Sequence, residues 1–417
     1  MQFQSIRGMK DILPSETPQW QWVEATLRTI MRRYSYQEIR LPILEPIELF
    51  QRAVGAATDI VAKEMYDFTD KSGEHITLRP EGTSGCVRSI IENDLCYHTT
   101  QRLWYQGPMF RYERPQKGRL RQFNQFGVET FGMAGPEIDS ELILLSHDIF
   151  TALGIAQHVR LEINSLGTPE ERAEHRAALV SYFEQHRELL DDDSLIRLDK
   201  NPLRILDSKN PDMQGMLEDA PQLLDYLSAE SRQHFQSVCA TLERAGIAYT
   251  INPRLVRGLD YYTRTVFEWI TDKLGAQSTV CGGGRYDGLV NLFCSYQLPA
   301  SGFAIGIERL LLLLDTLALP APAPTHLKIC FTCEDPALLS QMLLLGHQLH
   351  ALLPDCELRH DYSATKLKKQ HQRAIKEHAN IILTLNDATS LSIWVLASNQ
   401  KATISPHELH HLLAYLG

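Results

Sequence analysis

The sequence predicts an α+β protein with more than one domain, and three observations carry this prediction. Helical and strand-like patterns are mixed along residues 1–167, a charge-rich helical stretch follows at 168–246, and strand-like patterns return at 247–320. A proline-rich linker at 321–327 then precedes residues 328–417, where strands and helices alternate. The length of 417 residues also favours two or three domains over one.

The composition is that of an ordinary globular protein, with 44% hydrophobic and 22% charged residues. The net charge of -10 argues against a protein that coats nucleic acid non-specifically, although a local basic patch can still bind phosphate. Eight scattered cysteines suit reduced thiols, the N-terminus shows no secretory pattern, and Asp315 interrupts the longest apolar run. We therefore expect a cytoplasmic protein without a membrane span.

The first part opens with a predicted helix over residues 14–34. Ser15 and Thr17 are candidate caps, and the helical spacing is set by Trp20, Val23, Leu27, Ile30 and Met31. Residues 36–46 then favour an extended segment, and Pro42 within it indicates a sheet edge or an interface.

A basic stretch at 110–132, FRYERPQKGRLRQFNQFGVETFG, is typical of a β-hairpin with a long loop. Residues of one parity share a face of a strand, so Arg111 and Glu113 lie together on the first arm. On the second arm one face carries Arg121, Phe123, Gln125, Gly127 and Glu129, while Phe126 and Val128 face the core. A solvated amphipathic hairpin explains this pattern simply. However, a ring between charges beside a glycine also suits a nucleotide, with the ring on the base and Arg on phosphate.

Residues 75–93 predict a strand, a turn and a helix that opens at Thr83. Thr83 can cap this helix, and Glu81 in the turn can bind an amino group. In residues 254–269, Arg257, Asp260, Tyr261 and Tyr262 fall in a loop before a strand. Such a loop suits a carboxylate and a polar ring, although a surface turn is the simpler interpretation.

Two further segments contain glycines next to charged residues. Gly282, Gly283 and Gly284 allow the backbone to approach a neighbour closely, and the sequence has no Gly-Lys dipeptide and hence no P-loop. Any ATP must therefore be held by arginines. In residues 302–314 a strand of small residues runs into a helix, which places Arg309 at the sheet edge, where an ion pair with Glu308 is the simpler interpretation.

Together these segments resemble the class II aminoacyl-tRNA synthetases, and within them the histidyl-tRNA synthetases. IRGMKDILP, EIRLPILEP, the 110–131 hairpin and GFAIGIERL match in order, while RGLDYYTRTVFEW and GGGRYDGL single out the histidine enzymes. The resemblance implies an α+β catalytic domain built on an antiparallel sheet flanked by helices, with a helical insertion. It also implies a C-terminal α/β anticodon-binding domain, a homodimer, and ATP-dependent ligation of L-histidine to its tRNA with Mg²⁺.

The resemblance also implies roles for individual residues. Arg257 and Arg111 would be catalytic, both near the carboxylate and the α-phosphate. ATP would be held by Arg111, Glu113, Arg119, Phe123 and Arg309, and histidine by Glu81, Gly82, Thr83, Arg111, Gln125, Glu129, Arg257, Tyr261, Tyr262 and Tyr286. The tRNA would meet Arg114, Gln116, Lys366, Lys368, Lys369 and Arg373, with Lys376 on the same strip.

The C-terminal part departs from the family pattern, because Ser363-Ala364-Thr365 replaces the usual glycines. A second departure, NDATS at 386–390, replaces a glycine–acid turn, so the details of anticodon contact stay open.

Two short patterns resemble metal sites. They are Cys330-Phe-Thr-Cys333 and the HExxH at 407–411, for which a buried strand and a surface helix are the simpler interpretations. We expect no protein-only metal site. The alternative function is that of a non-catalytic relative, the regulatory subunit of ATP phosphoribosyltransferase, which typically lacks the C-terminal module.

Overall fold

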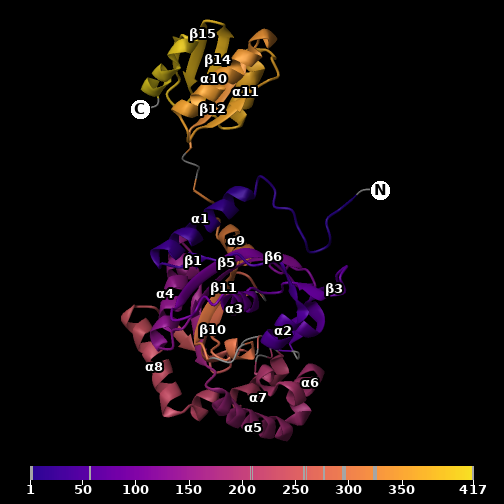
Figure 1. Cartoon of the computed structure of the whole chain (residues 1–417). Helices are drawn as coiled ribbons and strands as arrows, with labels where there is room; N and C mark the ends of the chain where they lie inside the picture. Colours follow the sequence, from indigo (N-terminus) through magenta and orange to yellow (C-terminus); the bar gives the residue numbers. More distant parts are fainter. Residues whose placement is uncertain are drawn as a thin grey trace. The chain divides into compact units, whose positions relative to one another are not determined.

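The computed structural model describes residues 3–55, 58–206, 208, 210–256, 259, 261–275, 278–293, 297–322 and 326–415. The chain forms two compact units, Met1–Ala321 and Pro322–Gly417, which are described separately (Figure 1). Among the helices of the described residues, none is long and apolar enough to cross a membrane.

The first unit is built on a large sheet, which has eight strands in the described residues. Its order is β1-β5-β6-β11-β10-β9-β7-β8, and its neighbours are antiparallel except for the parallel edge pairs β1–β5 and β7–β8. The predicted antiparallel platform is thus confirmed. The strands are β1 (Gln37–Glu38), β5 (Gln101–Phe110), β6 (Gln122–Phe131), β7 (Arg160–Ser165), β8 (Tyr249–Ile251), β9 (Thr263–Ile270), β10 (Thr279–Arg285) and β11 (Ala300–Gly306).

Two hydrophobic clusters draw on alternate residues of these strands. One contains Phe126 and Val128 and packs with α1 (Thr17–Arg33), α4 (Pro136–Ala152), α8 (Ala229–Arg244) and α9 (Ile307–Thr316). The other contains Leu103 and Tyr105 and packs with α2 (Ile47–Val54) and α3 (Thr83–Glu92). Because Phe126 and Val128 are fully buried in the first cluster, the predicted parity of the second hairpin arm is confirmed.

A small sheet, ordered β2-β4-β3, adjoins α2. It consists of β2 (Leu44–Pro46), β4 (His75–Leu78) and β3 (Tyr66–Thr69), with a π-helix at Ile60–Glu64 before β3. Its edge strand β2 falls in the predicted extended segment, as the proline there suggested. The apolar run at 310–314 belongs to helix α9 and is buried except for Leu312, which is partly exposed, so the expectation of a buried helix is confirmed.

Helix α1 begins at Thr17, and Val23, Leu27, Ile30 and Met31 are buried as the spacing predicts. The predicted side-chain caps are wrong. Glu16 occupies the cap position without a capping bond, its carboxylate accepts from the Leu13 amide, and the Thr17 hydroxyl donates to the Pro14 carbonyl. The proline-bearing turn before the helix uses these groups instead.

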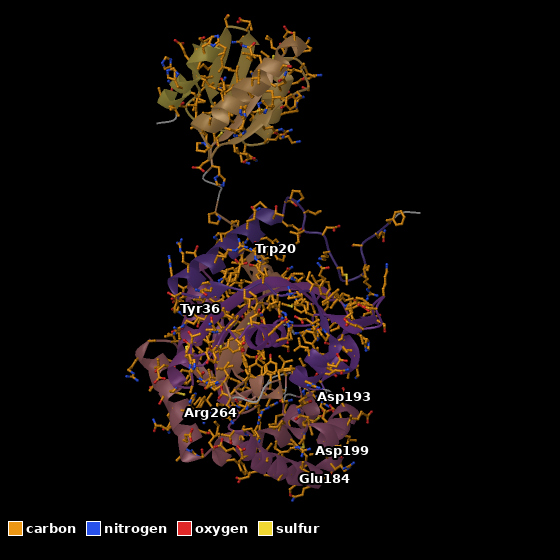
Figure 2. All side chains as sticks on the ribbon, in the orientation of Figure 1. Trp20, Tyr36, Glu184, Asp193, Asp199 and Arg264 are labelled. Atoms are coloured by element: carbon orange, nitrogen blue, oxygen red, sulfur yellow. The ribbon has the colours of Figure 1, made fainter. Side chains whose placement is uncertain are left out.

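The stretch between β7 and β8 is helical, as expected. It contains α5 (Pro169–Gln185), α6 (Asp192–Lys200), α7 (Gln214–Glu218) and α8, and Figure 1 shows α5, α6 and α7 grouped at the end of the unit remote from α1. Leu179 and Phe183 belong to a separate core here. Glu184, Asp193 and Asp199 lie on its outer surface (Figure 2), which explains the charge-rich pattern.

The second unit has a five-stranded sheet in its described residues, ordered β13-β12-β14-β15-β16. Strand β16 was not predicted. It pairs antiparallel with β15, which in turn pairs antiparallel with β14. The elements are β12 (Lys328–Cys333), α10 (Leu339–Leu352), β13 (Glu357–His360), α11 (Leu367–Lys376), β14 (Ile381–Asp387), β15 (Ser390–Val395) and β16 (Gln400–Ile404).

Both metal-like patterns have structural explanations in this unit. Cys330 and Cys333 are buried on β12. Residues Pro406–Tyr415, where a surface helix was expected, form 3₁₀ turns with a kink at Glu408, so the two outer histidines of HExxH do not lie on one regular α-helix. In the described part of the chain, no group of three or more His, Cys, Asp or Glu side chains could hold a metal. Short 3₁₀ turns also occur at Ala156–His158, Arg187–Leu189, Pro202–Ile205, Pro211–Met213, Leu223–Tyr226, Val290–Leu292 and Pro336–Leu338.

Candidate active site

A cavity of about 240 Å³ lies in the first unit between the β5–β6 hairpin, the start of α3 and strands β10 and β11. It gathers residues from six separate stretches of the sequence. The predicted residues that line it are Glu81, Thr83, Arg111, Glu113, Arg119, Phe123, Gln125, Glu129, Tyr261, Tyr262, Tyr286 and Arg309. Arg257 and Asp260 lie outside the described residues.

Three predicted residues lie beside the cavity rather than in its lining. Gly82 is the position before α3, where an added Cβ would lie 2.1 Å from the Tyr105 ring. Arg114 and Gln116 are exposed in the hairpin loop, and the Gln116 amide donates to the Arg119 carbonyl over 3.0 Å. These two residues therefore lie on the loop that adjoins the cavity.

Glu129 forms the closed end of the cavity and is 1% exposed. One carboxylate oxygen accepts from the Thr83 hydroxyl at 2.7 Å and from the Tyr105 hydroxyl at 3.0 Å, and the other accepts from the Tyr286 hydroxyl. Burial nevertheless raises the pKa of Glu129 to about 8, because these three donors offset only part of the lost hydration. Gly302 leaves room for this carboxylate, since a Cβ there would lie 2.0 Å from it.

Tyr105 is a site residue that the sequence analysis missed. It pairs with Gly127 across the hairpin, and a Cβ on Gly127 would lie 2.1 Å from its ring. The space that Gly127 opens is therefore filled by this tyrosine and not left for a ligand, which corrects the sequence interpretation. No local pattern marks Tyr105, because Gly82 and Gly127 face its ring only in the folded chain.

An aromatic wall stands beside Glu129. The rings of Tyr261 and Tyr262 are 4.7 Å apart, and Tyr286 lies 5.5 Å from the first and 6.4 Å from the second. All three are buried, so the interpretation of this segment as a surface turn is wrong for its tyrosines. The wall and the carboxylate together suit a small polar ring with a donor N–H.

Glu81, rather than Thr83, caps α3. Its oxygens accept from the Thr83 amide at 2.7 Å and from the Ser84 amide at 2.9 Å, so the prediction of a Thr83 cap is wrong. The Thr83 hydroxyl is thereby free of that task and points to Glu129. Two backbone amides of the first turn therefore hold the Glu81 carboxylate in place at the start of α3.

Cations and an aromatic ring mark the other end. The Arg111 guanidinium carbon lies 5.3 Å from the centre of the Phe123 ring, and its Nε donates to the Pro80 carbonyl at 2.9 Å. Burial lowers the pKa of Arg111. Since β5 ends at Phe110, Arg111 and Glu113 belong to the loop and not to the first hairpin arm, which corrects their predicted placement. Arg121 lies over the Tyr112 ring at 3.8 Å.

The remaining charges come from the hairpin loop and from α9. Arg119 forms an ion pair with Glu113, and Arg309 donates to the carbonyls of Gly118 and Thr279 at 3.1 and 2.9 Å. Glu308 accepts from the backbone and side-chain amides of Asn124 at 2.8 to 3.0 Å. Burial raises the pKa of this carboxyl. Arg309 thus ties α9 to the loop.

The glycines of β10 have two different tasks. Gly282 lines the cavity, whereas a Cβ on Gly283 would lie 2.3 Å from the Gly302 carbonyl of the neighbouring strand. The close approach at Gly283 is therefore to the sheet itself. The sequence alone could not distinguish a glycine that lines a cavity from one that packs against a neighbouring strand, because glycine suits both positions.

Known proteins share this sequence pattern and this fold. A family model described as histidyl-tRNA synthetase matches residues 8–310. The chain belongs to the histidyl-tRNA synthetase family. The solved apo histidyl-tRNA synthetase of S. aureus is 35% identical, with a TM-score of 0.81 and 99% of each chain covered. The resemblance seen in the sequence is thereby confirmed.

Two more distant structures share the fold. The histidyl-tRNA synthetase of Nostoc sp. PCC 7120 is 18% identical, with a TM-score of 0.68 and 99% of each chain covered. A Bacillus halodurans C protein titled ATP phosphoribosyltransferase regulatory subunit/histidyl-tRNA synthetase is 21% identical, with a TM-score of 0.63 and 93% of this chain and 99% of that chain covered. The fold alone therefore accommodates both an enzyme and a regulatory relative.

Proposed function

We propose that this chain is a histidine–tRNA ligase. It would activate L-histidine with ATP to histidyl-adenylate and pyrophosphate, and then transfer histidine to the 3′ end of its tRNA. The observation that carries the proposal is one cavity with a buried carboxylate and tyrosines at one end and arginines with a phenylalanine at the other. The two ends match the two substrates.

At the closed end, the imidazole of histidine would donate a ring N–H to Glu129. Tyr261, Tyr262 and Tyr286 would frame the ring, and Glu81, Thr83 and Gln125 would hold the amino group. A competitor without that N–H would leave the buried Glu129 carboxylate one donor short, with only the three hydroxyls, which costs several kcal/mol by the order of magnitude of an unmet charged hydrogen bond. The pocket would thus select histidine because other amino acids cannot supply the hydrogen bond to Glu129.

At the other end, Phe123 would stack on adenine, with Arg111 at the α-phosphate and Arg119 and Arg309 at the terminal phosphates. The substrate carboxylate is already ionised, so no strong base is needed for its attack on phosphorus. The barrier is the crowding of negative charge, and fixed cations reduce it. Arg257 would join Arg111 at the carboxylate and α-phosphate.

Mg²⁺ fits this end of the cavity by donor type. Glu113 and Glu308 line the cavity, and Mg²⁺ commonly binds through one or two carboxylates together with substrate phosphates. These two residues would hold the ion. When bound, it would neutralise charge on the phosphate oxygens.

The second unit would bind the anticodon. Lys366, Lys368, Lys369 and Lys376 are exposed on or next to α11, a strip that suits phosphate. Behind it is a hollow lined by His371, Trp394 and Lys401 among others, and an aromatic ring with a cation suits a base.

Arg373, expected on the same strip, is instead engaged within the unit. It donates to Asp361 at 2.9 and 2.7 Å, and also to the hydroxyls of Ser363 and Thr365. The residues that replace the family's glycines therefore anchor this arginine. We expect the exposed lysines to contribute more to RNA affinity than Arg373.

A homodimer is also proposed. Ile43, just before the edge strand β2, and Leu44, its first residue, are apolar and 44% and 43% exposed, so a second copy could cover them.

A histidine-dependent exchange of pyrophosphate into ATP tests the proposal, and charging of histidine tRNA tests its second step. Exchange with histidine alone among the amino acids, followed by charging, is the expected result. The regulatory relative remains the second candidate, because one distant structure carries both names. Histidine binding without exchange would favour that candidate.

A further inference from the structure

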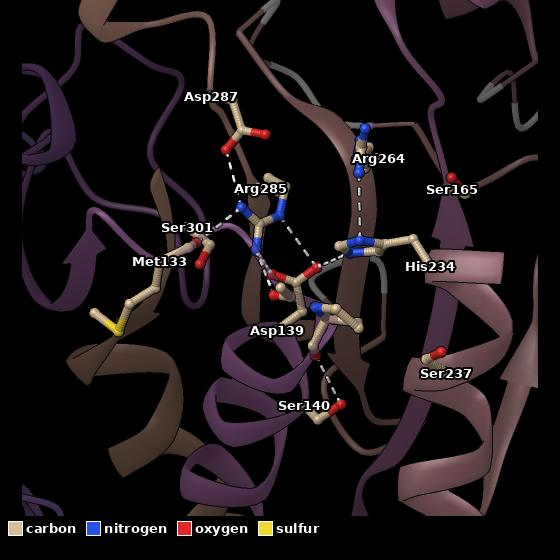
Figure 3. Close-up of polar contacts among 12 residues, drawn as sticks. Met133, Asp139, Ser140, Ser165, His234, Ser237, Arg264, Arg285, Asp287 and Ser301 are labelled. Atoms are coloured by element: carbon tan, nitrogen blue, oxygen red, sulfur yellow. Dashed lines mark hydrogen bonds and ion pairs between the residues drawn. The ribbon is translucent and has the colours of Figure 1, made fainter. Parts of the chain in front are cut away.

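A polar network joins the insertion to strands β9 and β10, next to the segments that carry the cavity's tyrosines (Figure 3). At its centre is Arg285, the last residue of β10, whose side chain is fully buried. Five hydrogen bonds occupy its five N–H groups: two to Asp139 at 2.7 and 3.3 Å, and one each to Asp287, Met133 and Gly135 at 3.0, 3.1 and 2.9 Å. This guanidinium therefore has one permitted orientation.

Arg285 fixes the residue that follows it. The Tyr286 amide donates to the Ala300 carbonyl at 2.8 Å, and the Asp287 carboxylate accepts from the Ala300 amide at 3.0 Å. Residues 285–287 are thus held to β11 on both sides of Tyr286, whose hydroxyl reaches Glu129. The direction of this tyrosine depends on the anchoring of Arg285.

The insertion completes the network through His234 of α8. Its Nε2 lies 2.8 Å from Asp139, and its Nδ1 lies 3.4 Å from the Arg264 guanidinium, which also reaches Glu230 at 2.7 Å. A neutral imidazole with its proton on Nε2 satisfies both contacts, donating to Asp139 and accepting from Arg264. Glu230 and His234 are one turn apart, so one face of α8 holds Arg264.

Arg264 in turn lies two residues after Tyr262. A second insertion helix reaches the same segment, because Arg172 of α5 donates to the Tyr262 carbonyl at 2.6 Å. The insertion therefore contacts both segments that carry pocket tyrosines, one through Arg264 and the other through Asp139 and Arg285.

The network is not needed merely to attach the insertion to the rest of the first unit. Phe235, Val238 and Leu242 of α8 already belong to the large apolar cluster. A buried charged network contributes little net stability compared with apolar packing, whereas its hydrogen bonds are directional. Its contribution is to hold the tyrosine segments in one geometry.

We propose that His234 is a positioning residue for histidine recognition, which acts through Asp139 and Arg285 on Tyr286 and through Arg264 on Tyr262. The inference rests on the proposed function, since it assigns the histidine pocket to those tyrosines. It makes the insertion a part of amino-acid selection.

The test compares His234→Leu with His234→Gln and with His175→Leu in the full-length protein. Gln keeps an N–H near the position of Nε2. His175 is a matched control, since it is a buried insertion histidine 2.7 Å from the Pro221 carbonyl, a contact made within the insertion. Pyrophosphate exchange gives the KM for histidine and for ATP, and thermal unfolding gives the stability of each variant.

We expect His234→Leu to raise the histidine KM roughly tenfold, in the range of site-to-site couplings, with the ATP KM within about twofold. His234→Gln should return most of the affinity, and His175→Leu should lower the unfolding temperature without changing the histidine KM. If His234→Leu does not fold, Arg264→Met decides the question. Arg264 is 23% exposed, so its loss removes the contact to His234 without emptying the core.

The outcomes are separable. An unmodified chain with no histidine-dependent exchange would overturn the proposed function and this inference with it. Normal exchange in the unmodified chain, with an unchanged histidine KM in His234→Leu or Arg264→Met, would overturn the inference alone. An equal KM change in His175→Leu, or no recovery in His234→Gln, would also overturn it, because the effect would then be general destabilisation.

Discussion

Glu129→Gln is the substitution whose consequences follow most directly from the structure. The carboxylate is 1% exposed, and burial raises its pKa from 4.5 to about 8. Between these values the folded protein keeps a proton that the unfolded chain releases. The stability from this group is therefore complete below about pH 4.5 and is lost as the pH rises through about 8.

The size of the effect follows from the same values. At about 1.4 kcal/mol for each tenfold change in proton affinity, ionisation of Glu129 costs the folded state roughly 5 kcal/mol at high pH. Between pH 5 and pH 9 its contribution to the free energy of unfolding should fall by about 4 kcal/mol. Gln has the same shape and cannot ionise, and the hydroxyls of Thr83, Tyr105 and Tyr286 can rotate to accept from its amide.

The assay is thermal unfolding of the ligand-free protein at pH 5, 7 and 9, followed by tryptophan fluorescence. Four of the five tryptophans lie in the first unit, so the signal reports mainly the unit that contains Glu129. The unfolding temperature of Glu129→Gln minus that of the unmodified chain should increase with pH. Glu188→Gln, at an exposed position, is the control and should give a constant difference. A constant difference for Glu129→Gln as well would refute the reasoning.

Three further predictions concern the two substrates and the tRNA. Arg257→Ala should leave histidine binding measurable by calorimetry and nearly abolish pyrophosphate exchange, so near-normal exchange would remove its catalytic role. Phe123→Ala should raise the ATP KM roughly tenfold by loss of stacking and leave the histidine KM unchanged; an unaltered ATP KM would contradict the stacking role. The double variant Lys368→Ala/Lys369→Ala should have a higher KM for tRNA in the charging reaction, and this KM should depend less on salt concentration. Pyrophosphate exchange should be unaffected. Loss of exchange in that double variant would argue against an RNA-specific role.

Much of the fold could be predicted from the periodicity of hydrophobic residues and from the residues typical of turns. The hairpin parity placed Phe126 and Val128 in the core and Phe123, Gln125 and Glu129 on the cavity side, because alternation in a strand is a local rule. Helix α3 began where the turn before it indicated. These successes depend on neighbours in the sequence.

The errors arise where distant groups compete for one residue. Thr83 is a good cap by type, but Glu81 takes the amides and Glu129 takes the hydroxyl. In the sequence, Tyr105 looks like an ordinary aromatic core residue. Its role is evident only from the pairing of β5 with β6, which places Gly127 opposite it. Strand β16 was missed because its pattern is short and mostly exposed. In each case the partner is fixed by the folded arrangement, and the residue type alone does not identify it.

If the proposed function holds, the selectivity of the pocket depends on groups that the ligand does not touch. Glu129 can accept an imidazole N–H only if burial keeps water away from it, and burial alone would favour its protonated form. Three hydroxyls reduce that cost, and one of them belongs to Tyr286, whose backbone is set by Arg285. Arg285 needs Asp139, and Asp139 also accepts from His234 on the insertion. On the proposed function, a change at His234, which the ligand does not touch, should hence weaken histidine binding and leave ATP binding nearly unchanged.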